Sequence, residues 1–348
     1  MSEDVLETIN QLSVHHLGNK NNDEDIFITK APIDLGDVQL QELLLKFFLT
    51  PFGTHEFYNF TFSNQDFKLN PLYIYATQIF DGINDFHLNT INIAKHLYEV
   101  SNHPLIKAGD LFIAHFSNLF IDNETVDGVG IFKSENRQSF IKINQNKNAF
   151  DLKYEDGINI EKLDKGCLIL NTEKEAGYKV CIVDKSNKGG EAQFWRDSFL
   201  MLRSRNDEYH QTKDFLNIAK NYVTKQMAED FEVNKTDQID ILNRSMEYFK
   251  NHDNFEKEMF EQEVFQQLEI IESFRKYDEI YREDNDILLA DSFEISNQAV
   301  KKQAKVFKSI LKLDKNFHIY IHGNKEMIEQ GVESDGRKYY KIYYKNEA

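Results

Sequence analysis

The chain has 348 residues and a formal net charge of −17, with 41% hydrophobic and 13% aromatic residues. This length suits two or three packed units, and the apolar content excludes a largely disordered chain. The charge argues against a nucleic-acid binder that uses its whole surface, because the phosphate backbone would repel most of it.

From the first residues and the apolar runs of the chain we expect neither a secretion signal nor a membrane-spanning segment. Met1-Ser2-Glu3-Asp4 is acidic and lacks the basic and apolar regions of a signal peptide. The longest uninterrupted apolar run covers five residues, 72–76, whereas roughly 20 are needed to span a bilayer. We therefore expect a cytoplasmic protein with no membrane partner.

The first hundred residues predict two strands and three helices. Residues 9–17 and 26–30 have strand-like patterns around an Asn/Gly/Asp-rich turn. Helices are predicted over 40–49, which ends before Pro51, over 72–80 and over 89–100.

From residue 109 the apolar residues alternate with a period of two, which is typical of β-strands. Six short strands separated by polar turns predict an antiparallel meander. They cover residues 111–116, 128–133, 139–143, 150–154, 167–171 and 179–184. Cys167 and Cys181 lie on two of these strands, and without a secretion signal we expect two reduced, buried thiols.

Helical patterns dominate the remainder of the chain. They cover residues 192–203, 212–227, 237–251, 255–281 and 298–313, with a polar hinge at 284–294 and strands at 317–322 and 338–344. We predict an α+β fold. Domain 1–190 holds an N-terminal antiparallel sheet with helices, and domain 191–348 is mainly helical and ends in a small β-hairpin.

Charge is divided sharply between two neighbouring blocks. Residues 229–294 carry 7 Lys and Arg against 20 Asp and Glu, whereas residues 296–345 carry 11 against 5. The predicted helix 298–313 lies in the basic block. At 3.6 residues per turn its lysines fall within an arc of roughly 80°, with Lys302 beside them and a separate apolar stripe at Val300, Ala304, Phe307 and Leu311. The lysines of this row are Lys301, Lys305, Lys308, Lys312 and Lys315.

Such a row would contact the DNA backbone with weak sequence selectivity, because lysine is a point charge without base-reading geometry. Five phosphate contacts would give log K against log salt a slope near −4.5, at about −0.9 per contact. The alternative is a solvated basic face that balances the acidic block.

The last predicted strand interleaves basic and aromatic residues. Arg337, Lys338 and Lys341 alternate with a series of tyrosines, a pattern that can bind nucleic acid through stacking and phosphate contacts. The alternative is a half-buried edge strand that its lysines keep soluble.

The sequence contains no motif for catalysis, a cofactor or a metal. His318 and His322 share a strand face but would lie roughly 13 Å apart, too far to bind one zinc ion. Asp127 with Asp151 and Lys153, on neighbouring predicted strands, resembles a metal-dependent nuclease only faintly. There is no P-loop, no Gly-x-Ser-x-Gly elbow and no Cys-x-x-Cys pair. We expect no enzyme activity.

Several longer strings resemble a known family, the bacterial nucleoid-associated NdpA-type proteins, in particular their Bacteroidetes forms. The resemblance covers nearly the whole chain. It implies DNA association, a location at the nucleoid and no catalytic activity, and it supplies no contact residues. The strings are residues 92–99 (NIAKHLYE), 124–128 (ETVDG), 130–136 (GIFKSEN), 163–169 (LDKGCLI), 298–304 (QAVKKQA) and 313–323 (LDKNFHIYIHG).

Two functional hypotheses follow. In the first, the chain binds double-stranded DNA non-specifically through its C-terminal lysines. In the second, it reaches the nucleoid through a protein such as a DNA-topology enzyme, with the acidic helices of 229–294 as the docking face. A homodimer would suit a protein that bridges two duplexes.

Overall fold

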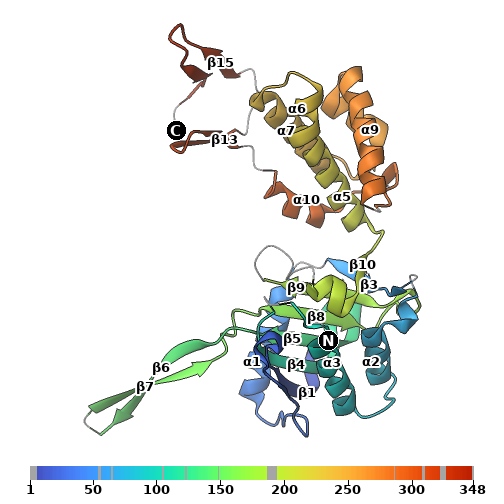
Figure 1. Ribbon diagram of the computed structural model, residues 1–348, viewed down its shortest axis with the longest axis vertical. Helices are drawn as coiled ribbons and strands as arrows, with labels where there is room; N and C mark the ends of the chain where they lie inside the picture. The colour runs from blue at the N-terminus through green and yellow to red at the C-terminus, as the bar shows by residue number, and fades with distance from the viewer. Residues whose placement is uncertain are drawn as a thin grey trace, which may run out of the picture. The chain divides into compact units, whose positions relative to one another are not determined.

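The computed structural model describes residues 6–53, 56–63, 66–103, 106–121, 124–147, 149–185, 194–285, 287–307, 310–321 and 327–346 (Figure 1). The chain divides into two compact units, residues 1–205 and 206–348. The domain boundary near residue 190 that the sequence suggests lies outside the described residues. Among the described helices, none has both the length and the apolar character needed to cross a bilayer.

The N-terminal unit is built on an eight-stranded antiparallel sheet. Its strand order is β10-β3-β9-β8-β5-β4-β1-β2. Four of the six strands of the predicted meander, β4, β5, β8 and β9, are therefore neighbours in this sheet, and β1 joins them beside β4. The strands are β1 (Thr8–Leu17), β2 (Ile26–Phe27), β3 (Phe57–Phe60), β4 (Gly109–Ile121), β5 (Glu124–Ser134), β8 (Lys165–Leu170), β9 (Lys179–Asp184) and β10 (Leu202–Ser204).

Each face of this sheet is covered by different segments. α2 (Pro71–Phe80), α3 (Phe86–Val100) and the π-helical segment Phe194–Leu200 share a core with one face. α1 (Val38–Leu49) shares a core with the other. The three helices begin where a polar side chain accepts hydrogen bonds from the first backbone amides, at Asp37, Asn70 and Asp85.

The two cysteines lie on adjacent strands but on opposite faces of the sheet. Cys167 on β8 belongs to the core beneath α2 and α3, and Cys181 on β9 belongs to the core beneath α1. Both are buried, as predicted, and neither is part of a disulfide bond. Burial raises the pKa of the Cys167 thiol well above its usual value.

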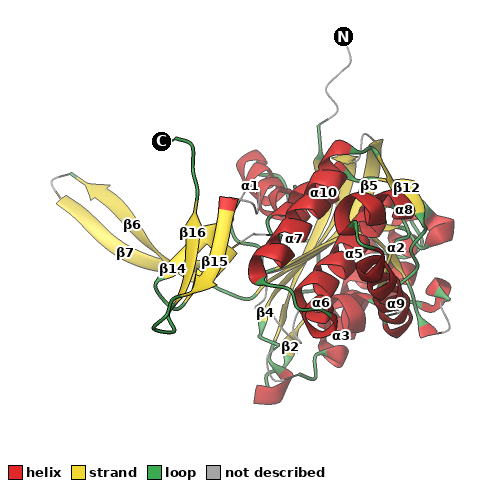
Figure 2. Ribbon diagram, turned by 90° about the horizontal axis from the view of Figure 1, so that it is seen from above, coloured by secondary structure: helices red, strands yellow, loops and turns green. Residues whose placement is uncertain are grey.

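The predicted strands 139–143 and 150–154 do not join the sheet. They form a separate hairpin, β6 (Gln138–Asn146) with β7 (Ala149–Gly157), whose described residues pair only with each other. Figure 2 shows this hairpin as a ribbon that extends away from the sheet. The alternation of apolar and polar residues predicted the two strands correctly, but this pattern does not indicate whether a strand joins a larger sheet.

The C-terminal unit is a helical bundle with an aromatic core, in which rings such as those of Phe215 and Phe260 meet edge to face, 4.9 Å apart. Its elements are α5 (Glu208–Asn221), a π-helical turn (Tyr222–Gln226), α6 (Met227–Asp230), α7 (Lys235–Asn251), α8 (Lys257–Phe260), a second π-helical turn (Glu261–Phe265), α9 (Leu268–Asp284) and α10 (Asn297–Ala304).

The single helix predicted over 255–281 is wrong. Residues Asn254–Glu256 form β11, which pairs with β12 (Ser292–Glu294) in the region predicted as a polar hinge. The pairing stacks the rings of Phe255 and Phe293 4.6 Å apart. The chain breaks again at Gln266, whose φ of 65° interrupts the helix before α9.

Two hairpins complete the C-terminal unit, so the α+β fold with an N-terminal sheet, central helices and a β finish is confirmed. β13 (Ile310–Leu313) pairs with β14 (Phe317–Tyr320), and β15 (Ile328–Val332) pairs with β16 (Lys338–Ile342). The first hairpin packs against the bundle, because Leu311 and Ile321 share a small core with Ile239 of α7.

Candidate nucleic-acid interface

α10 carries the first group of predicted DNA-binding residues. The Ser296 side chain caps the helix by accepting a hydrogen bond from the amide of Ala299. Ala299, Val300 and Gln303 are buried against the bundle. This packing leaves Lys301 and Lys302 on the exposed side, with Lys305 at the C-cap.

The helix is half as long as predicted, so the row of five lysines on one helical face is not formed. The amides of Val306 and Phe307 both donate to the carbonyl of Gln303 in a turn that ends the helix. Phe307 packs in the bundle core whereas Leu311 packs in the separate core beside α7, and a continuing helix could not place both. Lys312 therefore lies on β13, Lys315 lies in the turn after it, and Lys308 lies outside the described residues.

The β13–β14 hairpin instead presents a basic and aromatic face that the sequence did not reveal. Leu311 and Ile319 oppose each other on the face toward α7. On the other face, Lys312 opposes His318 and Ile310 opposes Tyr320, which is 58% exposed. The turn Asp314-Lys315-Asn316, with Asp314 at a φ of 52°, is the sequence signal that could have indicated this hairpin.

Two of the three cations predicted on the last strand have acidic neighbours. Arg337 forms an ion pair of 2.7 Å with Asp335. Lys341 lies 3.5 Å from Glu329, which also accepts a hydrogen bond of 2.6 Å from the Tyr343 hydroxyl. The hydrogen bond from Tyr343, together with Lys341, holds the pKa of Glu329 below its usual value. Both cations are thus balanced within their own hairpin.

The remaining predicted cations are exposed and differ in their contacts. Lys302 lies 5.7 Å from the centre of the Tyr209 ring, a cation–π geometry. Within the described part of the chain, no carboxylate lies in ion-pair range of the others. They are Lys301, Lys305, Lys312, Lys315 and Lys338.

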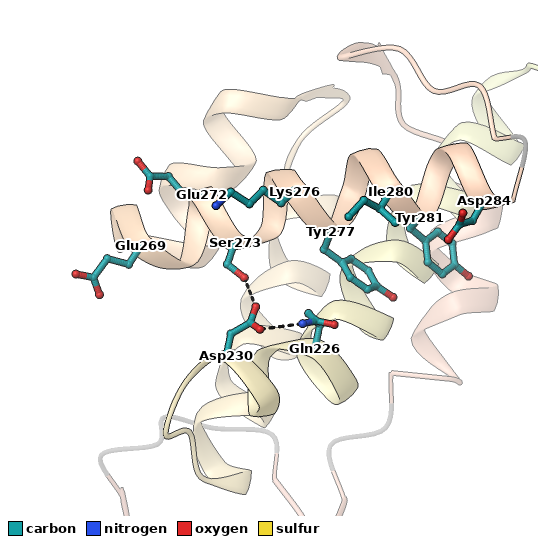
Figure 3. Close-up of a pocket in the computed structure, with 10 residues that line it drawn as sticks. All are labelled: Gln226, Asp230, Glu269, Glu272, Ser273, Lys276, Tyr277, Ile280, Tyr281 and Asp284. Carbon is teal, nitrogen blue, oxygen red and sulfur yellow. Dashed lines mark hydrogen bonds between the residues drawn. The ribbon is translucent and has the colours of Figure 1, made fainter.

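An acidic groove lies on the same unit, between α9 on one side and Gln226 and Asp230, at the two ends of the stretch containing α6, on the other (Figure 3). Its volume is about 600 Å³. Four carboxylates and one ammonium group surround an apolar wall of two tyrosines and an isoleucine, and Gln226 and Ser273 both donate hydrogen bonds to Asp230. The lining residues are Gln226, Asp230, Glu269, Glu272, Ser273, Lys276, Tyr277, Ile280, Tyr281 and Asp284.

The structure does not bring the nuclease-like residues together. Asp127 lies on β5, which pairs with β4 and β8, whereas Asp151 and Lys153 lie on β7, which pairs with β6. The suggestion that they lie on neighbouring strands is wrong. His322 lies outside the described residues, and among the residues that the structure describes no three His, Cys, Asp or Glu side chains could hold a metal ion.

Comparison with known proteins adds one finding. Residues 13–336 match the model of the NA37 family, described as nucleoid-associated protein YejK. No curated protein matches the chain.

Proposed function

The chain belongs to the family of the nucleoid-associated protein YejK, and on that premise we propose that it binds double-stranded DNA directly through the phosphate backbone. The site of action is the nucleoid, in the cytoplasm. The proposed contacts come from three elements of the C-terminal unit. They are Lys301, Lys302 and Lys305 on α10, Lys312 and Lys315 on the β13–β14 hairpin, and Lys338 on β16.

The observation that carries this proposal is a difference in ion pairing within one unit. In the acidic helices, Lys257 and Arg282 both bind Asp278, at 2.8 and 2.6 Å, and Arg275 binds Glu261. Five exposed lysines of the C-terminal elements, Lys301, Lys305, Lys312, Lys315 and Lys338, have no such neighbour among the described residues. An ammonium group without a local carboxylate gains most from a phosphate, because no existing ion pair has to break.

We expect Arg337 and Lys341 to contribute less to DNA affinity than the sequence suggests. Each would have to exchange Asp335 or Glu329 for a phosphate. If the five lysines other than Lys302 each contact one phosphate, log K should fall against log salt with a slope near −4.5. Base selectivity is weak, because a lysine ammonium group lacks the planar fork that reads guanine.

The test is fluorescence anisotropy with a labelled duplex across a range of NaCl concentrations. Lys301→Glu with Lys305→Glu should lower the affinity at least about tenfold, because two attractive charges become repulsive. The fold should persist, because Ala299 and Val300 provide the packing of α10.

A matched control is Lys225→Glu with Lys250→Glu, which reverses two exposed lysines elsewhere in the same unit. It changes the net charge equally and should lower affinity much less. An equal loss in the two variants would show that overall repulsion, and not a local site, controls binding.

We also propose that the chain is not an enzyme and needs no cofactor. Supercoiled plasmid incubated with the protein and Mg²⁺ or Mn²⁺ should remain intact. Nicking that copurifies with the protein and is lost in an Asp127→Asn variant would contradict this.

The acidic groove supports a second candidate function, docking of a basic protein segment from a partner such as a DNA-topology enzyme. Tyr277, Ile280 and Tyr281 offer apolar contact while the surrounding carboxylates offer charge complementarity. The segment 256–263 is a poorer docking face, because Glu261 within it is buried in its ion pair with Arg275.

This second function is tested by pull-down with a purified DNA-topology enzyme. Glu269→Lys with Glu272→Lys, in the groove, should abolish capture. Glu279→Lys with Glu283→Lys, exposed on the same helix but outside the groove, should not. If the groove variant still captured the enzyme, the groove would be excluded as the docking site. Direct DNA binding would be tested separately by the anisotropy assay.

A further inference from the structure

The β6–β7 hairpin exposes one continuous apolar face. In its register Ile141 opposes Tyr154 and Ile143 opposes Leu152, with Phe150 beyond them toward the tip. Since alternate residues of a strand point to the same side, these five side chains share one face. Each is between 62% and 77% exposed.

The other face of the hairpin is mainly polar and balanced in charge, with Phe140, 45% exposed, as its large apolar side chain. Lys142 lies 3.1 Å from Glu155 on this face. Ser139, which donates a hydrogen bond of 2.7 Å to Asp156, lies on the apolar side, at the base of the hairpin. Residues 138–157 contain three lysines and three carboxylates. The hairpin is therefore neutral, on a chain whose net charge is −17.

The apolar face has no cover within the described part of the chain. β6 and β7 pair only with each other (Figure 2). An isolated two-stranded hairpin is marginally stable in water, and both its outer edges remain open to pairing. An apolar ribbon of this kind marks a contact with another macromolecule.

We propose that this face is the contact between two copies of the chain. A two-fold dimer brings the same surface of each copy together, so one apolar ribbon is a sufficient interface. With about 200 Å² for a fully exposed side chain of this size, the five residues present roughly 700 Å² per copy. Covering both copies would bury roughly 1,400 Å², within the range of about 1,200–2,000 Å² for stable interfaces.

Charge favours a second copy over DNA as the occupant. Two chains of net charge −17 repel each other least where both are neutral, and the hairpin is such a place. DNA, by contrast, needs an excess of cations, and Asp151, Glu155 and Asp156 cancel the three lysines of the hairpin. This inference does not depend on DNA binding by the C-terminal unit.

The test is sedimentation equilibrium of the full chain at several concentrations. The wild type should be a dimer at micromolar concentration. Ile143→Lys with Leu152→Glu should raise the dimer dissociation constant at least about 100-fold. This pair of substitutions removes the centre of the apolar face, keeps the net charge and places opposite charges across the two strands, which supports the hairpin itself.

The matched control is Lys142→Glu with Glu155→Lys, which reverses an ion pair on the polar face and should leave the dimer intact. A monomeric wild type at tens of micromolar would overturn the proposal, and so would a dimer that survives Ile143→Lys with Leu152→Glu. If Ile143→Lys with Leu152→Glu left self-association unchanged but lowered the affinity for DNA, the apolar face would be a DNA contact and not the dimer interface.

Discussion

Lys312 lies directly opposite His318 across the β13–β14 hairpin, and both side chains face solvent. Tyr320 lies on the same face of the hairpin, because it is two residues from His318 along β14. Leu311 on the other face belongs to the core with Ile239 of α7. The packing of Leu311 against α7 therefore places Lys312 on the side of the hairpin that faces solvent.

The salt dependence of DNA binding should resolve individual lysines. Lys312→Gln should make the slope of log K against log salt shallower by about 0.9, because one phosphate contact is lost. Arg337→Gln should change the slope much less, because Arg337 is already paired with Asp335 at 2.7 Å. Anisotropy titrations at four or more NaCl concentrations measure both slopes. Equal changes in the two variants would show that the Asp335 ion pair does not restrain Arg337.

The sequence predicted six of the eight strands of the N-terminal sheet because their apolar residues follow a simple pattern, but it missed β3 and included most of β10 in the helix predicted over 192–203. Along β8, for example, Cys167 and Leu168 alternate between the two cores that cover the sheet. It failed on α10, because Val300, Ala304, Phe307 and Leu311 have helical spacing although the chain buries the last two in different cores. Only the tertiary pairing of β13 with β14 decides between these outcomes.

Prediction of the candidate site was limited in the same way. The lysines of the basic block were identified from composition, but which of them keep a carboxylate neighbour depends on hairpin register. Glu329 is paired with Lys341 because the two residues oppose each other across β15 and β16. The acidic groove could not be predicted from the sequence, because its wall combines Tyr277 of α9 with Gln226, which lies more than forty residues earlier in the chain.

Buried charge in the N-terminal sheet should make Glu135 essential for stability. Lys133 and Lys165, both buried, lie 2.9 and 3.1 Å from this one carboxylate. Burial lowers the pKa of Lys133, and Glu135 opposes that shift. Glu135→Gln should therefore cost about 3–5 kcal/mol in the free energy of unfolding, because two buried ammonium groups lose their counterion.

The control for that variant is Glu161→Gln, which breaks the exposed ion pair with Lys46 and should cost no more than about 0.5 kcal/mol. The Glu135→Gln protein should also recover stability as the pH rises toward 10. Loss of the proton from Lys133 removes a buried charge from the folded state first, while the unfolded lysine stays protonated up to its ordinary pKa. Urea titrations at pH 7 and 9.5 measure this, and a loss of stability on raising the pH would contradict it.

His15 should make the N-terminal unit less stable in mild acid. Burial, and then the nearby His87, lower the pKa of His15 to about 4. The unfolded chain therefore takes up a proton between pH 6.5 and 4 that the folded chain refuses, and stability falls as the pH falls through this window. Between pH 7 and pH 5 the loss should be about 2 kcal/mol. His15→Gln should make the free energy of unfolding depend less on pH between pH 7 and pH 5. If urea titrations showed an unchanged pH dependence, other groups would be responsible for it.

The acidic helices contain carboxylates of two kinds, which a pair of adjacent substitutions on α9 should separate. Asp278 is 1% exposed and binds Lys257 and Arg282 at 2.8 and 2.6 Å. Asp278→Asn should cost about 3 kcal/mol, because Arg282 loses its buried counterion and Lys257 keeps only the exposed Asp291, at 3.9 Å. Glu279→Gln, at the exposed neighbouring position, should change stability by no more than about 0.5 kcal/mol. Thermal and urea unfolding of the two variants measure the difference. Equal destabilisation by the two substitutions would contradict this division. The buried carboxylates of α9 could then not be assigned to stability and the exposed ones to docking.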